Sequence, residues 1–563
     1  MKYLPGFLLL LTSWLQSTHV LPWVSWHSEI LALLALGWFM LVALLEKRRA
    51  RETELAIPRI VWVPTILGLY ALGQFAWGQI EFFGDALMIM IYMAAAAMAL
   101  TVGYGWGINS RLAIHADVVP TQLSQLAMTL LVGALLSVVI MLVQAFDVWT
   151  TSDWIVRTEG FRRPGGNLGQ TNHMGTLLLM GMTSLVLLSQ TKQLGVRVAG
   201  MMQLLLILAL AMTESRTGLL SAGLVTAWWF AHRGLFTKGR PGRQLAYAWL
   251  VLLFLVWAWP LFIQTWHFAE GVRRMNADAG MRLVVWTQLL EAVMQRPWAG
   301  WGLREVSEAH NAVLHHYATA GPFSYAHNVL LDLMIGLGIP LALLMVGLFV
   351  RWAWNRMRAT STLSDWYCLA IAIPLGVHSM LEFPYAYFYF LLPVLLAIGM
   401  IESSAEPVPG PRVRTAYAAA GTWVVFMVMA WSAVEYVVIE EDFRVARFEA
   451  LKVGQTPSEY TQPKILILTQ LDAMLKATRI RPAPRMPEPE IELLRQAAMR
   501  FPWTAIQNRY ALSLALNGNL EEARRQLQVM RAMHGEKHYA GIKAAWEQQA
   551  QEKYPQLKEI KLP

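Results

Sequence analysis

The sequence contains a single cysteine, Cys368, which lies inside an apolar run. One thiol excludes an intrachain disulfide framework in any redox compartment. Charged residues are also scarce, at 15% of the 563 residues, whereas hydrophobic residues make up 56% and the mean hydropathy is +0.40. A water-soluble protein of this length is not so apolar, and the composition therefore predicts an all-α, polytopic membrane protein.

Two motifs of metal and nucleotide chemistry are missing as well. The sequence has no G-x-x-x-x-G-K-[ST], which disfavours nucleotide-driven transport, and no H-E-x-x-H. His310, His315 and His316 cluster near Glu308, but no aspartate pair at ligand spacing accompanies them. We therefore expect neither a metal nor another cofactor, and alanine variants of the three histidines should keep substantial activity.

Apolar segments long enough to cross a bilayer, about 20 residues each, recur along the whole chain. We expect thirteen transmembrane helices, at residues 4–20, 29–45, 58–77, 83–103, 121–145, 172–190, 197–213, 217–231, 244–265, 328–350, 364–381, 385–402 and 415–438. The N-terminus has the outline of a signal peptide, yet no A-x-A-like cleavage site follows it. The first segment is therefore expected to remain as a helix.

Three short basic loops predict the orientation in the membrane. They are EKRRAR at 46–51, HRGLFTKGRPGR at 232–243 and RWAWNRMR at 351–358, and alternate counting places all three on one face, which is the cytoplasmic one. The net charge of +9 thus reflects membrane orientation, and no nucleic-acid partner is expected. The predicted domains are a transmembrane domain, 1–438, with a large periplasmic loop at 266–326, and a periplasmic helical domain, 439–563.

The C-terminal region differs from the rest in being charged and poor in long apolar runs. Residues 510–530 read YALSLALNGNLEEARRQLQVM, with apolar residues at helical spacing on both sides of NGN. This pattern resembles one tetratricopeptide-like helical hairpin. No second clear repeat follows, so the sequence does not establish a solenoid.

Arginine is unusually frequent on the predicted outer face. The residues concerned are Arg157, Arg162, Arg163, Arg216, Arg273, Arg274, Arg282, Arg296 and Arg304. Long outer segments can escape the positive-inside rule, which is an equally good explanation for Arg296 and Arg304. It is a weaker one for Arg163 and Arg216, which lie at helix ends. The planar guanidinium binds phosphate oxygens in pairs, so these residues suit a lipid-linked phosphate or diphosphate.

Three segments could supply such a phosphate site. In RRPGGNLGQTNH, Arg163 precedes a glycine-rich turn, and Asn172 stands near the start of the next helix. ESRTG places Arg216 in a short loop, and MRLVVWTQLLEAVMQRPWAGWG places Arg282 on an amphipathic helix, with Trp286 expected at the membrane interface one turn later.

Histidines provide the candidates for proton transfer. His327 and Asn328 occur in SYAHNVLLDLMIGLGIP, where the long outer loop becomes a helix. An imidazole at this boundary could transfer a proton at neutral pH, although a lone histidine there is more often only interfacial. His378 and Glu382 are four residues apart and share a helix face, either as an acid with its partner or as a buried, satisfied pair.

Four segments, taken in their order along the chain, resemble the superfamily of bacterial O-antigen ligases, O-antigen polymerases and pilin-type protein O-oligosaccharyltransferases. They are RRPGGNLGQTNH, SRTG, the R…W…P…GWG pattern and AHNVLLDLMIGLG. The resemblance covers roughly residues 154–400, and the helical tail is similar to that of the oligosaccharyltransferase branch. It implies a glycosyltransferase C-like fold in the bacterial inner membrane. It also implies a glycan donor on undecaprenyl diphosphate that is used on the periplasmic face.

Residue by residue, the resemblance implies that Arg163, Arg216 and Arg282 bind the diphosphate and that His327 is catalytic. Residues implied to line the same cavity are Gln170, Asn172, His173, Asn328, His378 and Glu382. The implied acceptor is Ser or Thr of a periplasmic, pilin-like protein. The alternatives are ligation of O-antigen to lipid A core, O-antigen polymerisation, and transport of a lipid-linked glycan, whose charges should follow a path through the bilayer.

Overall fold

The computed structural model describes residues 2–112, 119–149, 152–157, 163–236, 241–266, 277–405 and 410–563. Arg162, Arg273 and Arg274 therefore lie outside the described residues. Helices dominate what is described, and strands are limited to β1 (Glu54–Ala56) and β2 (Arg412–Arg414), which pair antiparallel with Leu55 opposite Val413.

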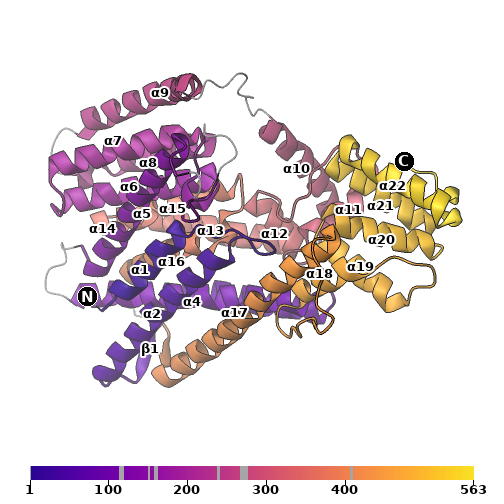
Figure 1. The fold of residues 1–563 in the computed structure, drawn as a ribbon. Coiled ribbons are helices and arrows are strands. Elements are labelled where there is room, and N and C mark those ends of the chain that lie inside the picture. The colour runs from indigo at the N-terminus through magenta and orange to yellow at the C-terminus, as the bar shows by residue number, and fades with distance from the viewer. Residues whose placement is uncertain are drawn as a thin grey trace. The chain divides into compact units, whose positions relative to one another are not determined.

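The chain divides into two compact units (Figure 1). The first contains Met1–Ile66, Tyr92–Arg273 and Val350–Met427, and the second contains Leu67–Ile91, Arg274–Phe349 and Val428–Pro563. Four of the five boundaries fall within helices, which are α3 (Trp62–Ala76), α4 (Phe83–Leu112), α13 (Ile339–Ala359) and α17 (Thr415–Leu451).

The first unit contains most of the long apolar helices. Its remaining helices are α1 (Leu4–Leu15), α2 (Trp26–Arg49), α5 (Thr121–Ala145), α6 (Thr171–Gln190), α7 (Val196–Thr213), α8 (Arg216–Ala231), α9 (Pro241–Trp266), α14 (Leu363–Ala370), α15 (Ala372–Ser379) and α16 (Phe388–Ala405). Short 3₁₀ turns are η1 (Arg59–Val61), η2 (Gly166–Leu168), η3 (Arg233–Leu235) and η4 (Pro384–Ala386).

The predicted helices are present, but two of them are broken. The segment predicted at 121–145 matches α5 residue for residue. The segment at 328–350 divides at Gly338, which has φ +76° and lies so close to Trp298 that a Cβ would be 2.3 Å from its carbonyl oxygen. The segment at 364–381 divides into α14 and α15. Within the described ranges, 8 helices are long and apolar enough to span a bilayer, so the count of thirteen stays a prediction.

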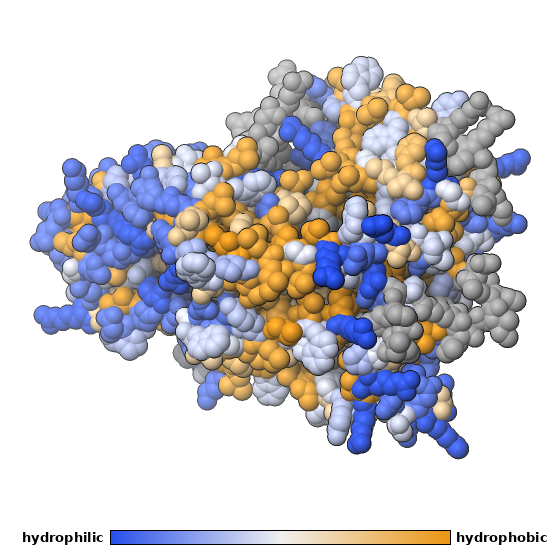
Figure 2. Space-filling model, turned by 180° about the vertical axis from the view of Figure 1, so that it is seen from behind, coloured by the Kyte–Doolittle hydropathy of each residue, from blue (hydrophilic) through white to orange (hydrophobic). Residues whose placement is uncertain are grey.

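Apolar residues cover much of the face seen in Figure 2. On α9, for example, Leu250 is 63% exposed, Phe254 60% and Trp257 66%. Continuous apolar surface of this kind is unfavourable in water but favourable against lipid tails. Together with the long apolar helices, it makes the chain an all-α, polytopic membrane protein.

The second unit contains shorter helices and the C-terminal region. They are α10 (Ala277–Gln295), α11 (Val306–Leu314), α12 (Val329–Leu337), α18 (Thr469–Arg479), α19 (Glu488–Arg500), α20 (Thr504–Leu516), α21 (Leu520–His534) and α22 (Glu536–Glu552), followed by η5 (Pro555–Glu559). The predicted hairpin is present, because α20 and α21 pack together across a turn at Gly518, whose φ is +90°.

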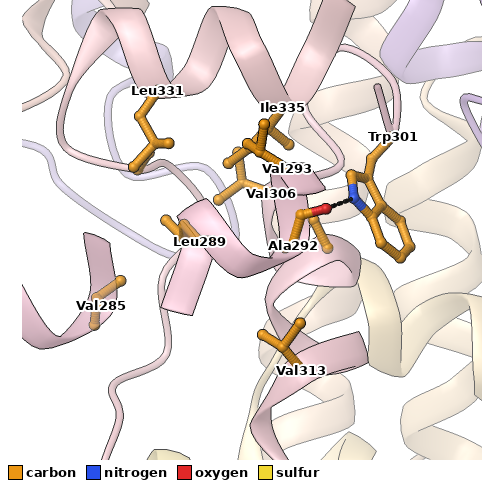
Figure 3. Packing of buried hydrophobic residues seen from close by; sticks show 11 residues of the cluster. Val285, Leu289, Ala292, Val293, Trp301, Val306, Val313, Leu331 and Ile335 are labelled. Atoms are coloured by element: carbon orange, nitrogen blue, oxygen red, sulfur yellow. Dashed lines mark hydrogen bonds between the residues drawn. The ribbon is translucent and has the colours of Figure 1, made fainter. Parts of the chain in front are cut away.

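A buried apolar cluster joins α10, α11 and α12 (Figure 3). Leu289 and Ile335 are completely buried in it. The Trp301 indole N–H donates to the carbonyl oxygen of Ala292 at 2.8 Å, so the loop after α10 is fixed to that helix. Trp301 is also held to α12, since its backbone N–H donates to Ile335 at 2.7 Å.

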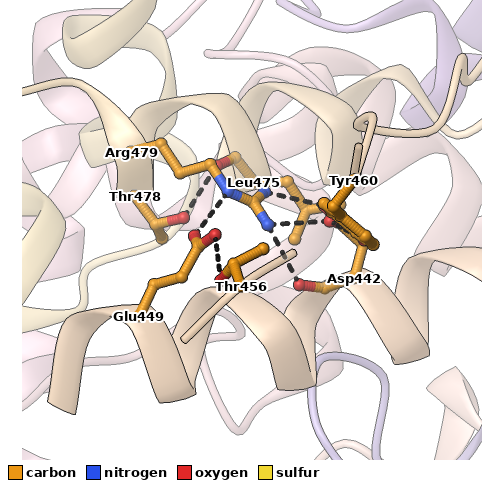
Figure 4. A network of polar contacts seen from close by, with 7 residues as sticks. All are labelled: Asp442, Glu449, Thr456, Tyr460, Leu475, Thr478 and Arg479. Atoms are coloured by element: carbon orange, nitrogen blue, oxygen red, sulfur yellow. Dashed lines mark hydrogen bonds and ion pairs between the residues drawn. The ribbon is translucent and has the colours of Figure 1, made fainter. Parts of the chain in front are cut away.

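Ionic contacts fasten the segment that follows α17 (Figure 4). Arg479 contacts Asp442 at 2.7 Å and Glu449 at 3.0 Å, while the Tyr460 hydroxyl donates to Asp442 at 2.6 Å. The carboxylate of Glu435 accepts backbone hydrogen bonds from residues 466–468, just before α18. The predicted domain boundary at 438/439 falls inside α17, which changes from apolar to charged without ending.

Candidate active site

The glycine-rich loop before α6 has a fixed shape. Gln144 of α5 accepts from the backbone N–H of Gly166 at 2.9 Å and donates to its carbonyl at 3.0 Å. Asn167 donates to the carbonyls of Leu15 and Trp154 at 2.7 and 2.8 Å. Gly166 and Gly169 have φ values of +59° and +68°, in the left-handed region where glycine is favoured. The loop is therefore built to hold one backbone conformation.

Arg163 lies where this loop meets two helix ends. Its Nε donates to the carbonyl of Thr213 at the end of α7, at 3.1 Å, and its Nη2 donates to the Thr171 hydroxyl at the start of α6, at 3.0 Å. These bonds use only part of a guanidinium that has five N–H donors. Arg163 is thus oriented by the fold while donors remain for another acceptor.

Arg216 is the first residue of α8 and is exposed. Its neighbour Ser215 caps the helix by accepting from Gly218 N–H at 2.9 Å, and the same hydroxyl donates to Oδ1 of Asn172 at 2.6 Å. The cap therefore links the beginning of α8 to the beginning of α6. A cation at the positive end of a helix is unfavourably placed unless an anion accompanies it.

Polar side chains on α6, on α15 and just after α15 continue this network. The Asn172 amide donates to Glu382 at 3.2 Å, and the Thr176 hydroxyl contacts Nδ1 of His378 at 2.9 Å. The rings of His173 and His378 lie 5.4 Å apart. Because His378 is completely buried and Glu382 is only 2% exposed, both side chains need these hydrogen bonds in place of water.

The first unit thus brings together the predicted site residues Arg163, Asn172, His173, Arg216, His378 and Glu382. Gln170 is the residue immediately before α6 and makes no side-chain cap there. His378 and Glu382 are both buried, and each is joined to α6 by a hydrogen bond, to Thr176 and Asn172 respectively.

The second unit contains Arg282, His327 and Asn328. His327 has φ +53°, and its ring lies edge-on to Phe323 with 4.8 Å between centroids. The residue before it is held on both sides, since Ala326 N–H donates to Asp332 at 3.0 Å and the Trp286 indole donates to Ala326 O at 2.7 Å. His327 therefore stands on a segment whose backbone is fixed.

Asn328 is the N-cap of α12, and its side chain accepts from the N–H groups of Leu330 and Leu331 at 3.0 and 3.2 Å. Its role in the fold is thus to begin the helix directly after His327. Arg282 lies half-buried on α10, one turn before Trp286. Trp286, which is expected at the membrane interface, also helps to fix the His327 segment, because its indole N–H donates to the carbonyl of Ala326.

The histidine cluster at residues 310–316 has structural partners. His310 is completely buried and contacts Gln288 at 2.9 Å, and burial lowers the pKa of its imidazole to about 4. His316 pairs with Glu291 at 3.0 Å. No group of three or more His, Cys, Asp or Glu side chains could hold a metal in the part of the chain described. An alanine variant of His310 would therefore also disturb packing, and it is a poor control for activity.

Several residues of the network were not singled out from the sequence. They are Gln144, Asn167, Ser215, Thr213 and Asp332, which hold the loop, the helix ends and the His327 segment. Only Ser215 had a local signal, because serine before a helix is a common N-cap. The others act through partners that are distant in the sequence.

Three family descriptions match the chain in succession. Residues 164–188 match the family described as protein glycosylation ligase, and residues 201–346 match O-antigen ligase. Residues 366–549 match the C-terminal part of the family described as virulence factor membrane-bound polymerase. Arg216, Arg282 and His327 lie in the second match, and Asn172 and His173 lie in the first.

Two proteins of Acinetobacter baylyi are similar over most of their length. A general O-oligosaccharyltransferase is 26% identical over 558 residues, which cover 94% of this chain and 92% of the relative. A ComP-specific O-oligosaccharyltransferase is 25% identical over 384 residues, which cover 67% of this chain and 66% of that relative. These matches confirm the resemblance to the superfamily of O-antigen ligases and O-antigen polymerases, and within it to the branch of protein O-oligosaccharyltransferases.

Proposed function

We propose that this enzyme transfers an oligosaccharide from undecaprenyl diphosphate to a serine or threonine hydroxyl of a periplasmic, pilin-like protein. Support for a protein acceptor comes from the two relatives, both of which are named as O-oligosaccharyltransferases. Transfer takes place at the periplasmic face of the bacterial inner membrane. The C-terminal helical region lies on the same side.

The observation that carries the proposal is the placement of Arg163 and Arg216 at helix ends. Arg163 is oriented by two hydrogen bonds, and Arg216 is exposed at the positive end of α8. Neither arginine forms an ion pair with any described residue. A bound diphosphate would neutralise both charges and accept hydrogen bonds from the N–H groups at the start of the helix. Arg282 is proposed to contact the same group from α10.

The chemistry requires little beyond charge neutralisation and one base. The acceptor hydroxyl oxygen attacks the anomeric carbon of the glycan, and the bond from that carbon to the diphosphate oxygen breaks. His327 accepts the proton of the hydroxyl, and the arginines stabilise the charge that develops on the departing diphosphate. Undecaprenyl diphosphate is the second product. Asn172, Gln170, His173, His378 and Glu382 line the donor site and orient its polar groups.

Arginine variants test the diphosphate site. Arg163→Ala, Arg216→Ala and Arg282→Ala should each reduce transfer, and lysine should restore it poorly because an ammonium group lacks the paired N–H donors. Each lost charge-assisted contact should cost about 1.5 to 3 kcal/mol of binding. The measurement is transfer in vitro from purified lipid-linked glycan to an acceptor, at matched protein levels. Wild-type turnover in all three alanine variants would contradict the proposal.

A deletion strain distinguishes the acceptors. Loss of glycopeptides with unchanged lipopolysaccharide supports the protein acceptor. Loss of capped lipid A core, with glycopeptides intact, would instead support O-antigen ligation, which the match at residues 201–346 keeps as the second candidate. Shortened O-antigen chains would support polymerisation.

A further inference from the structure

Arg304 is an outer-face arginine for which the proposed function supplies no role. It lies in the loop between α10 and α11 and has φ +71°, an uncommon backbone conformation for a residue with a side chain. Its neighbour Gly302 approaches the chain so closely that a Cβ would lie 2.5 Å from the carbonyl oxygen of Gln79. The conformation of this loop is thus imposed by its surroundings.

One carboxylate, that of Asp85, joins Arg304 to the C-terminal region. Arg500 at the end of α19 donates to both oxygens of Asp85, at 2.6 and 2.8 Å. The side chains of this pair are only 3% and 8% exposed. The Nε of Arg304 lies 3.8 Å from Oδ1 of the same carboxylate. A buried carboxylate that is already held by two hydrogen bonds gives Arg304 a rigid anchor.

On its other side, Arg304 faces the segment that carries His327. Its guanidinium lies over the ring of Tyr325, 5.3 Å from the centroid, at a distance typical of a cation–π contact. Tyr325 is followed by Ala326, whose backbone N–H and carbonyl are held by Asp332 and Trp286. The Tyr325 contact therefore adds a third restraint on the chain just before His327.

We propose that Arg304 is a positioning residue, which holds the Tyr325–His327 segment in place through the Asp85–Arg500 pair. This inference rests on the proposed role of His327 in transfer. It gives the C-terminal region a part in the reaction step itself. Without Arg500, Asp85 would lose two of its hydrogen bonds and would no longer be a rigid anchor, so Arg304 and the His327 segment would be held less firmly.

The test compares Arg500→Gln and Arg304→Gln with Arg479→Gln. Arg479 is a matched control, because it forms a similarly buried arginine pair in the same region but contacts Asp442 and Glu449 instead. For the full-length enzyme, kcat should fall about tenfold to a hundredfold in the first two variants, since a misplacement of about 1 Å can cost a hundredfold. KM for the lipid-linked donor should stay the same. Arg304→Lys keeps the cation over Tyr325 and should recover part of kcat.

A second measurement reports on His327 independently of transfer. The rate of its acylation by diethyl pyrocarbonate, followed by mass spectrometry, should change in Arg500→Gln and Arg304→Gln. It should not change in Arg479→Gln, and exposed His538 serves as the reference in every variant.

The outcomes separate the two proposals. An unchanged acylation rate and an unchanged kcat in both variants would overturn the positioning role. So would an equal loss of kcat in Arg479→Gln, because the effect would then come from general destabilisation. A changed acylation rate together with an active His327→Ala enzyme would support the linkage to Arg500 but contradict the proposed function.

Discussion

Ser215 is the side chain whose removal should damage the arginine site most directly. Its hydroxyl caps α8 through Gly218 and also donates to Asn172, so Ser215→Ala removes both bonds at once. Loss of an N-cap costs about 1 kcal/mol. An acceptor left without its donor costs about 1 to 3 kcal/mol, and the half-buried position of Asn172 favours the lower end. The two terms give a destabilisation of about 2 kcal/mol.

Transfer should also decrease, because Asn172 loses a partner that orients it and Arg216 stands on a helix end that is no longer capped. Thermal unfolding of the detergent-solubilised enzyme measures the stability, and transfer in vitro measures the activity. Ser221→Ala is the matched control. Ser221 is 1% exposed on the same helix, but its hydroxyl donates only to the Thr217 carbonyl, at 2.8 Å. Ser215→Thr should keep both bonds.

Equal stability and equal turnover in Ser215→Ala and Ser221→Ala would refute this reasoning. It would mean that the bond to Asn172 contributes nothing that water cannot replace. A loss of turnover without a loss of stability would contradict the expected destabilisation of about 2 kcal/mol and would leave only the orienting role of the hydrogen bond to Asn172.

Three further predictions follow from buried groups and from the topology. Burial, with nearby Asp85, raises the pKa of Glu305 from 4.5 to about 8, so the contribution of Glu305 to stability is greatest below pH 4.5 and falls as the pH rises to 8. Glu305→Gln should therefore flatten the dependence of the unfolding temperature on pH over this range, and an unchanged dependence would contradict the prediction. His310→Ala should lower stability by about 1 to 3 kcal/mol, since Oε1 of Gln288 loses its contact with the imidazole, whereas His316→Ala should unfold at nearly the wild-type temperature. A reporter fused after Pro563 should be active in the periplasm, and activity confined to the cytoplasm would reverse the assigned topology.

Local patterns in the sequence predicted the helices well. Apolar runs bounded by polar residues predicted 121–145 as one helix, and α5 has these bounds. The break at Gly338 was not predicted, because it depends on the close approach of Trp298, about 40 residues earlier in the chain. The helix also extends beyond the span predicted at 415–438, since α17 continues to Leu451 where polar residues replace apolar ones. Helical backbone continues as readily with charged side chains as with apolar ones.

For the site, residue types and motif order identified candidate residues, but the sequence did not show which of these residues contact one another. Asn172 and Glu382 are 210 residues apart, and Asp85 and Arg500 are 415 residues apart. No periodicity in a single sequence connects such pairs. Asp85 was not recognised as important, because one acid near the start of an apolar run is usually a solvated helix end. Its burial and its two arginines become visible only in the folded chain.

The left-handed backbone of His327 affects how its variants should be interpreted. With φ at +53°, the position favours glycine and asparagine over most other residues. His327→Ala therefore removes the imidazole and also places a residue of poor αL tendency in a restrained turn, so loss of activity could have two causes. Asparagine tolerates the same backbone but has no titrating nitrogen. An inactive His327→Asn enzyme with normal stability would assign the loss to missing proton transfer, whereas an active one would show that the backbone shape of the turn matters more than the base.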